Sequence, residues 1–306
     1  YVAANSYLNA YANARAGGKT KVIALNWGIW ADVGMAAQAV ASNPDGQPEP
    51  VNAPLLDDMG FDSQGHRMFG ATLGVNRWLL DGHRTASGQA LLPGTGYLEI
   101  IAEALRAQGE PASFEIRDLY FYQPFEVADT VPTAMRARLM RSEEGYSFDL
   151  RSAVQTDGRT GWRLHAESRL LPLATVSERL DLLAIAARLP QPETGIGLVS
   201  PQEAHLRFGA RWRVLRSRAF GPAEGLARLT LPTNFAAEAQ NWLLHPALMD
   251  MATGWAMPLI DGYTPDHLWV PLSYKRVRVL RALPEDVVSW VRLVPGSGPG
   301  EAEFDI

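Results

Sequence analysis

The chain has 306 residues, no cysteine and a formal net charge of −5 at pH 7. Its 47% hydrophobic and 20% charged residues are typical of a globular protein with a buried core, and its length suits roughly two domains. The lack of cysteine excludes disulfides, thiolate metal sites and cysteine nucleophiles, and the negative charge disfavours binding to nucleic acid. No apolar run could span a bilayer and no signal peptide is recognisable, so we expect a cytoplasmic protein without a membrane partner.

The first segment, residues 1–41, predicts a helix over 1–15, then a glycine pair and a strand over 21–27. Tyr1 and Asn5 lie one turn apart on this helix. Together with the Asn-Trp-Gly run on the strand, they resemble the end of a ketoreductase domain of the short-chain dehydrogenase type. That resemblance makes Tyr1 the acid and Asn5 its support. We expect an inactive, Rossmann-like remnant here, with NADPH serving only the incomplete ketoreductase.

A linker rich in Pro, Asn and Gly, residues 42–52, leads to a region whose most informative run is 78–98. The run reads WLLDGHRTASGQALLPGTGYL. It predicts that an apolar strand ends at 78–80 and that an Asp-Gly turn then presents His83. A Ser-Gly break follows, and a short strand covers 89–92.

A helix is expected next, because Pro-Gly-Thr at 93–95 is typical of a helix start. Apolar residues at helical spacing predict one buried face of this helix: Leu98, Ile101 and Leu105. Charged residues predict a polar face opposite to it: Glu99, Glu103 and Arg106.

His83 beside the free N–H groups of a helix start suits base-catalysed chemistry on a thioester or another acyl group. The imidazole would remove a proton while the helix start polarises the carbonyl group. A lone histidine next to a strand is more often structural, so the interpretation depends on its neighbours.

The region from 113 to 171 has the alternation of an antiparallel meander. The predicted strands are 114–121, 133–140, 146–153 and 162–170. A helix followed by a meander indicates an α+β fold.

The second half repeats this outline after a mixed bridge that contains a helical piece at 177–189. We predict strands over 211–220, 226–231, 268–280 and 287–294, and an apolar helix over 243–260 that opens at a His-Pro pair. A proline thus opens the main helix of each half.

Asp250 lies one turn into the second helix, between apolar neighbours. A carboxyl group in such a place is costly unless it is paired or used. An exposed aspartate near a helix start is an equally ordinary interpretation. No two histidines have metal-ligand spacing with a carboxylate, so we predict no metal site.

Two signatures connect these residues. His83, Gly88 and Pro93, followed by the helix start in PGTGYLE, resemble the first signature of the dehydratase domains of modular polyketide synthases and animal-type fatty acid synthases. The run HPALMD at 245–250 resembles the second, in which an aspartate faces that histidine. There are two departures from the family: His83 and Gly88 are five positions apart rather than four, and Gly254 stands where glutamine or histidine is usual.

The resemblance implies a double hot-dog fold of the α+β class, in which two fused units each wrap an antiparallel sheet around a helix. The implied boundaries are 53–175 for the first hot-dog, 176–201 for the linker between the units and 202–306 for a truncated second hot-dog.

The resemblance also implies residue roles. His83 would be the base and Asp250 the acid, while the N–H of Gly94 would receive the thioester oxygen. Pro93 and Gly88 would help to position the substrate. Four residues in less specific matches would line a tunnel: Phe208, Gly209, Pro246 and Pro271.

The implied reaction is syn elimination of water from a 3-hydroxyacyl thioester on the phosphopantetheine arm of an acyl carrier protein. No cofactor is expected for this step. The implied partners are the carrier protein, other polyketide synthase domains and a second copy in a homodimer. The alternatives are a dehydratase-like double-bond isomerase or cyclase and a non-catalytic structural domain. A hot-dog thioesterase is a weaker alternative, because those enzymes are usually single units.

Overall fold

The computed structural model describes residues 48–156, 158–173, 179–298 and 300–306. The expected ketoreductase remnant, with Tyr1 and Asn5, lies outside these residues. Residues Pro48–Phe61 and His66–Ile306 form one compact unit, which is the part considered below. Among the described residues, no helix is both long enough and apolar enough to cross a membrane.

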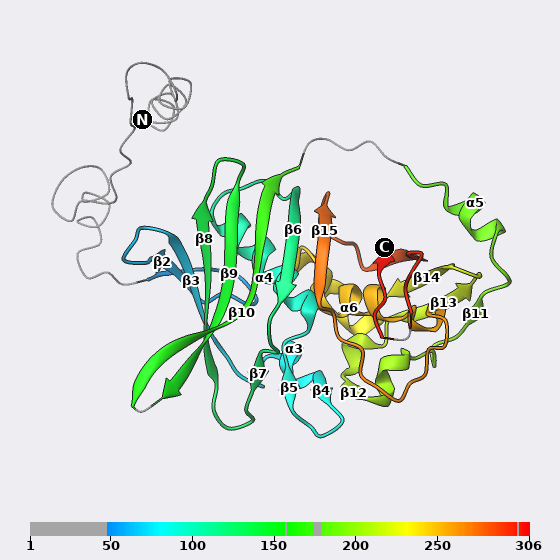
Figure 1. Cartoon of the computed structure of the whole chain (residues 1–306), viewed down its shortest axis with the longest axis horizontal. Helices are drawn as coiled ribbons and strands as arrows, with labels where there is room; N and C mark the ends of the chain where they lie inside the picture. The colour runs from blue at the N-terminus through cyan, green and yellow to red at the C-terminus, as the bar shows by residue number, and fades with distance from the viewer. Residues whose placement is uncertain (1–47, 157, 174–178, 299) are drawn as a thin grey trace, which may run out of the picture. The chain divides into compact units, whose positions relative to one another are not determined.

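The larger sheet of this unit has eight strands in the order β1-β2-β3-β8-β9-β10-β6-β15, and each adjacent pair is antiparallel. Figure 1 shows its central strands side by side, with α4 lying against them. The meander is confirmed, since β6, β8, β9 and β10 include the four predicted strands. The strands are β1 Glu49–Pro50, β2 Asp58–Phe61, β3 Arg67–Leu73, β6 Phe114–Phe121, β8 Thr133–Arg141, β9 Tyr146–Thr156, β10 Arg159–Pro172 and β15 Ser273–Val279.

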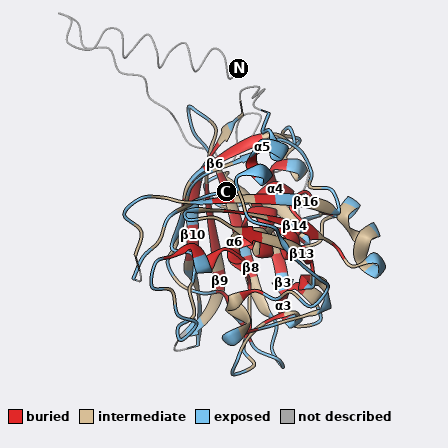
Figure 2. Cartoon of the chain, turned by 90° about the vertical axis from the view of Figure 1, so that its right-hand side faces the viewer, coloured by how far each residue is buried: buried red, intermediate tan, exposed pale blue. Residues whose placement is uncertain are grey.

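Helix α4, Gly94–Ala107, begins directly after Pro93, as predicted. The expected polar face was wrong, because Glu99 and Glu103 are both 0% exposed. Helix α4 lies between the large sheet and segments that cover its other side, so it is buried all round over 95–105. In Figure 2 most of α4 is red, the colour of buried residues. The two carboxyl groups accept hydrogen bonds from main-chain N–H groups.

The second sheet has five strands in the order β11-β13-β14-β16-β17. Helix α6, Pro246–Gly254, packs against it through buried Trp255 at its C-terminal end, whose indole N–H donates to Ser289 in β16 at 3.0 Å. The predicted helix over 243–260 was too long, because the chain N-terminal to Pro246 instead hydrogen-bonds to Glu99. The strands are β11 Glu193–Thr194, β13 Leu215–Phe220, β14 Glu224–Thr230, β16 Asp286–Leu293 and β17 Phe304–Asp305.

Two strand pairings join the N-terminal and C-terminal halves of the sequence. Strand β15 comes from the second half but pairs with β6 of the large sheet. A small sheet, β12-β4-β5-β7, pairs the second-half strand β12 with β4 of the first half. Its strands are β4 His83–Thr85, β5 Ala90–Leu91, β7 Glu126–Val127 and β12 Leu206–Phe208.

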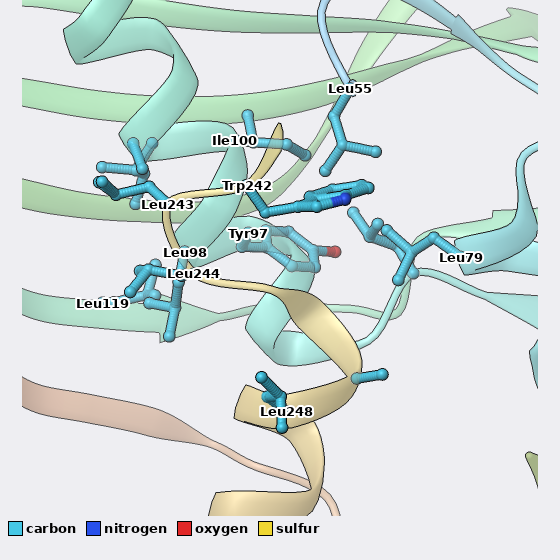
Figure 3. Close-up of a cluster of buried hydrophobic side chains, with 14 of the residues drawn as sticks. Leu55, Leu79, Tyr97, Leu98, Ile100, Leu119, Trp242, Leu243, Leu244 and Leu248 are labelled. Carbon is cyan, nitrogen blue, oxygen red and sulfur yellow. The ribbon is translucent and has the colours of Figure 1, made fainter. Parts of the chain in front are cut away.

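The core is continuous across these contacts. Figure 3 shows Trp242 from the second half gathered with Tyr97 of α4 and Leu55, while Leu243 and Leu244 lie near Leu98. This shared core buries apolar surface from both halves and so stabilises their association.

Short helices complete the unit. Residues 78–81 form helix α3, Trp78–Asp81, rather than the end of a strand, so that prediction was wrong. Residues 210–212 likewise form a 3₁₀ turn rather than the start of a strand. The other short helices are α5 Leu182–Ala187, η1 Pro201–Ala204, η2 Ala210–Trp212, η3 Thr233–Asn241 and η4 Met257–Leu259.

Candidate active site

His83 is the first residue of β4 and not part of a turn. Its side chain is buried, and Nδ1 lies 3.0 Å from the carbonyl oxygen of Leu91 in β5. A carbonyl group can only accept a hydrogen bond, so Nδ1 carries the proton. In the neutral ring, Nε2 therefore keeps a free lone pair.

Close approach of two glycines sets the position of His83. The N–H of Gly209 donates to the carbonyl of Gly82 at 2.8 Å, and a Cβ atom on Gly209 would lie 2.9 Å from Gly82 Cα. This contact holds β12 against β4 so that Phe208 pairs with His83 across the strands. The centroids of the Phe208 and His83 rings are 5.7 Å apart. Phe208 and Gly209 thus support the imidazole from the second half of the chain.

Asp250 lies on α6, and its Oδ2 is 3.8 Å from Nε2 of His83. The separation exceeds a hydrogen bond but leaves the two groups facing one another. Burial raises the pKa of Asp250, while the nearby His83 and a hydrogen bond from Trp212 lower it, and the net direction is upward. The structure therefore brings together the two residues that the sequence singled out, and burial shifts the pKa of Asp250 in the direction that a proton donor needs.

Trp212 is a residue of this site that the sequence analysis missed. Its indole N–H donates to Oδ2 of Asp250 at 2.7 Å. The ring stacks on Phe208 at 5.9 Å and lies 6.1 Å from the His83 ring. Trp212 therefore touches both candidate catalytic groups. Its position four residues after Phe208 is the only local signal, and that spacing is common.

The start of α4 lies beside the same residues. Pro93 is the N-cap and makes no side-chain capping bond, and the first N–H groups of a helix have no partner within it. A Cβ atom on Gly94 would lie 2.9 Å from Pro271 Cγ and 3.7 Å from the Tyr274 hydroxyl. A larger residue at 94 would have to displace the Pro271 ring. The Thr95 hydroxyl donates to the carbonyl of Pro246 at 3.4 Å, so the starts of α4 and α6 are adjacent.

The remaining predicted residues lie at different depths. Pro246 is buried at the first position of α6, and Pro271 is exposed but covers Gly94. Gly88 lies in the β4–β5 hairpin turn with a φ of 94°, which favours glycine, and its carbonyl accepts from Arg84 at 2.7 Å. Gly88 thus shapes the turn after His83.

Gly254 lies one turn beyond Asp250 on α6. A Cβ atom there would be 2.8 Å from Oε1 of Gln202, which comes from η1. The space that a side chain at 254 would need is therefore filled by the amide of Gln202.

His245 is fully buried beside this site. It stacks on Trp78 with ring centroids 5.4 Å apart, and burial lowers its pKa to about 4. Neither ring nitrogen has a hydrogen-bond partner among the described residues. A neutral ring packed on indoles fits a structural role for His245.

Comparisons with protein families match most of the described chain. Residues 53–153 match the family described as "Polyketide synthase dehydratase domain", and residues 186–306 match "Polyketide synthase dehydratase N-terminal domain".

Curated relatives are long proteins of which this chain covers a small part. Polyketide synthase PksM of Bacillus subtilis (strain 168) is 23% identical over 257 residues, which are 78% of this chain and 6% of that protein. A mycocerosic acid synthase-like polyketide synthase of Mycobacterium tuberculosis is 28% identical over 221 residues, which are 66% of this chain and 10% of that protein.

Solved structures show the same fold. A trans-AT polyketide synthase dehydratase domain from Brevibacillus brevis has a TM-score of 0.71 at 21% identity, covering 84% of this chain and 92% of that one. The dehydratase domain of RzxB from Pseudomonas fluorescens has a TM-score of 0.69 at 24% identity, covering 82% and 91%. These similarities confirm the double hot-dog fold.

Proposed function

The chain belongs to the polyketide synthase dehydratase family, and from this premise we propose that it eliminates water from a 3-hydroxyacyl thioester to give a trans-2-enoyl thioester. The acyl group would be carried on the phosphopantetheine arm of an acyl carrier protein. The observation that carries the proposal is the 3.8 Å approach of His83 Nε2 to Asp250 Oδ2, from opposite halves of the chain.

In this reaction His83 acts as the base. Its Nδ1–H is held by the Leu91 carbonyl, so the Nε2 lone pair is free to take the proton from the α-carbon of the substrate. Charge then develops on the thioester oxygen. The N–H of Gly94, at the start of α4, would donate to that oxygen, and such a donor contributes about 10²–10³ in rate.

Asp250 acts as the acid. Its raised pKa favours the protonated carboxyl group, which donates its proton to the departing hydroxyl group as the carbon–oxygen bond breaks. A base and an acid that reach the adjacent α- and β-carbons from the same side give a syn elimination. The 3.8 Å separation of His83 and Asp250 fits a syn elimination.

The proton balance closes without another group. After elimination His83 holds the proton from the α-carbon, and Asp250 has lost its own. Transfer of the proton from His83 to Asp250 restores both groups, so the net products are water and the enoyl thioester.

The curated relatives are polyketide synthases, and this chain spans a tenth of their length or less in the two described above. We propose that the reaction is one step of such a multifunctional acyltransferase assembly. The partners would be an acyl carrier protein, neighbouring synthase domains and a second copy in a homodimer. The dehydratase step itself would need no cofactor.

The test compares the wild-type chain with His83→Ala and Asp250→Asn on a 3-hydroxyacyl carrier-protein substrate. Each proton transfer contributes about 10²–10⁴ in rate, so either variant should lose at least that much turnover. Mass spectrometry should show a product lighter by one water molecule. Wild-type turnover in either variant would refute the role of that residue, and conversion without loss of mass would indicate an isomerase or cyclase.

A further inference from the structure

Tyr274 places a hydroxyl group beside the candidate active site that the steps above do not use. It is the second residue of β15, and its ring packs edge-on against Phe121 with centroids 5.7 Å apart. Phe121 packs in the same way against Tyr97 of α4 at 5.1 Å. These contacts fix the ring, and its oxygen lies 3.7 Å from where a Cβ atom on Gly94 would be.

The same hydroxyl group also lies near the proposed acid. Burial together with the nearby carboxyl group of Asp250 raises the pKa of Tyr274, and the side chain of Thr253 opposes this. The starts of α4 and α6 are adjacent, since the Thr95 hydroxyl donates to the carbonyl of Pro246. The phenol is therefore close to the start of α4, which would bind the thioester oxygen, and to the helix that carries Asp250.

The oxygen of Tyr274 can accept a hydrogen bond as well as donate one. Thr253 directs its own proton at the carbonyl oxygens of Met249 and Asp250 within α6, both at 3.1 Å. A phenol oxygen has lone pairs beside its single proton, so Tyr274 can accept from a bound ligand.

We propose that Tyr274 accepts a hydrogen bond from the 3-hydroxyl group of the substrate and so positions the leaving group for Asp250. This inference rests on the proposed dehydration. A 3-hydroxyl group has one proton to donate and an oxygen that accepts. Asp250, when protonated, donates to that oxygen, so the hydroxyl proton needs an acceptor. Without one, a buried hydroxyl group would lose a hydrogen bond.

The role makes Tyr274 a determinant of specificity. A ligand with a 3-hydroxyl group gains this hydrogen bond, whereas a 3-deoxyacyl ligand or the enoyl product does not. The enzyme would therefore favour the substrate over its own product.

The experiment measures binding in the His83→Ala background, where turnover is blocked, with 3-hydroxyacyl and 3-deoxyacyl pantetheine thioesters as probes. Adding Tyr274→Phe should weaken binding of the 3-hydroxyacyl probe about tenfold and leave the 3-deoxyacyl probe unchanged. The matched control is Tyr122→Phe, which removes a hydroxyl bonded to Glu167 on the exposed part of the large sheet. An equal effect on both probes, or on neither, would overturn the inference.

A second measurement separates this inference from the proposed reaction. With His83 intact, Tyr274→Phe should lower kcat/KM about tenfold, and Thr253→Val should lower it less, because the phenol remains. If the wild-type chain does not dehydrate 3-hydroxyacyl thioesters but the two probes still respond differently to Tyr274→Phe, the proposed reaction fails and the binding role stands. If dehydration occurs and the probes respond alike, only the role of Tyr274 fails.

Discussion

At the scale of single residues, the site is a set of side chains whose protonation states depend on one another. The Leu91 carbonyl fixes the tautomer of His83, and Trp212 donates to the carboxyl group of Asp250. His83 and Asp250 were predictable because each lies in a recognisable motif. Trp212 was not, because an indole reveals its partner only after folding has buried it.

Trp212→Phe should change the pKa and the orientation of Asp250 without removing its carboxyl group. The substitution keeps a ring to stack on Phe208 but deletes the N–H that lowers the pKa of Asp250. That pKa should rise further, so the alkaline limb of the pH–rate profile, where Asp250 loses its proton, should move to higher pH. We also expect kcat to fall about tenfold, because the carboxyl group loses the donor that orients it.

A pH profile of kcat/KM checks this prediction. Trp242→Phe is the control, since Trp242 is a core indole near α4 whose ring packs against Trp78 and His245. An alkaline limb that stays in place or moves to lower pH would contradict the assignment of Trp212.

At the scale of elements, local patterns identified α4 and the meander correctly, because both have a regular period and clear end signals. The pattern failed at 78–81, where three apolar residues fit a strand and a buried helix equally well. It also assigned Glu99 and Glu103 to an exposed face. Amphipathic periodicity assumes that one face meets water, and α4 is covered on every side.

Gly94→Ala tests whether the substrate contacts the start of α4. The added methyl group would lie 2.9 Å from Pro271 and must push that ring away. Alanine favours the helix itself by up to about 1 kcal/mol, so stability should change little. Activity should fall at least about tenfold, because the methyl group occupies the space beside the proposed N–H donor.

The control for this substitution is Gly60→Ala in β2, where nothing lies within 4 Å of the added methyl group. Thermal unfolding and kcat/KM should be measured on both variants. Full activity in Gly94→Ala, with a normal melting temperature, would exclude the α4 start as a place where substrate binds.

At the scale of the whole unit, two buried carboxyl groups hold separate segments on α4. Glu99 accepts from the N–H groups of Leu243 and Leu244 at 3.0 and 2.6 Å, which ties α4 to the second half. Glu103 accepts from Leu55 at 2.9 Å through its closer oxygen. These links, like the pairing of β15 with β6, join residues far apart in the sequence. Local periodicity could not predict them, since it contains no information about distant partners.

The free energy of unfolding above neutral pH should therefore depend on whether Glu99 and Glu103 are protonated. Burial raises the pKa of Glu99 from 4.5 to about 7 and that of Glu103 to about 8. A group whose pKa is raised on folding stabilises fully below its unfolded pKa, and that contribution is lost as the pH rises through the folded pKa. Between pH 7 and 8.5 the native state should release protons that the unfolded state has already lost. His245, with its pKa lowered to about 4, stays neutral in the native state throughout this range.

Glu103→Gln removes the titratable group at position 103 and leaves Glu99 unchanged, so it measures the contribution of Glu103 alone. Both oxygens of Glu103 approach the same N–H of Leu55, at 3.2 and 2.9 Å, so a single amide oxygen can replace them. The variant should match the wild type near pH 5 and exceed its free energy of unfolding at pH 8.5. The difference should grow by at most about 1.4 kcal/mol per pH unit, the slope for one proton. Urea denaturation from pH 5 to 8.5 measures it, with the exposed Glu144→Gln as control. Parallel curves for Glu103→Gln and the wild type would show that Glu103 keeps no proton in the folded state near neutral pH.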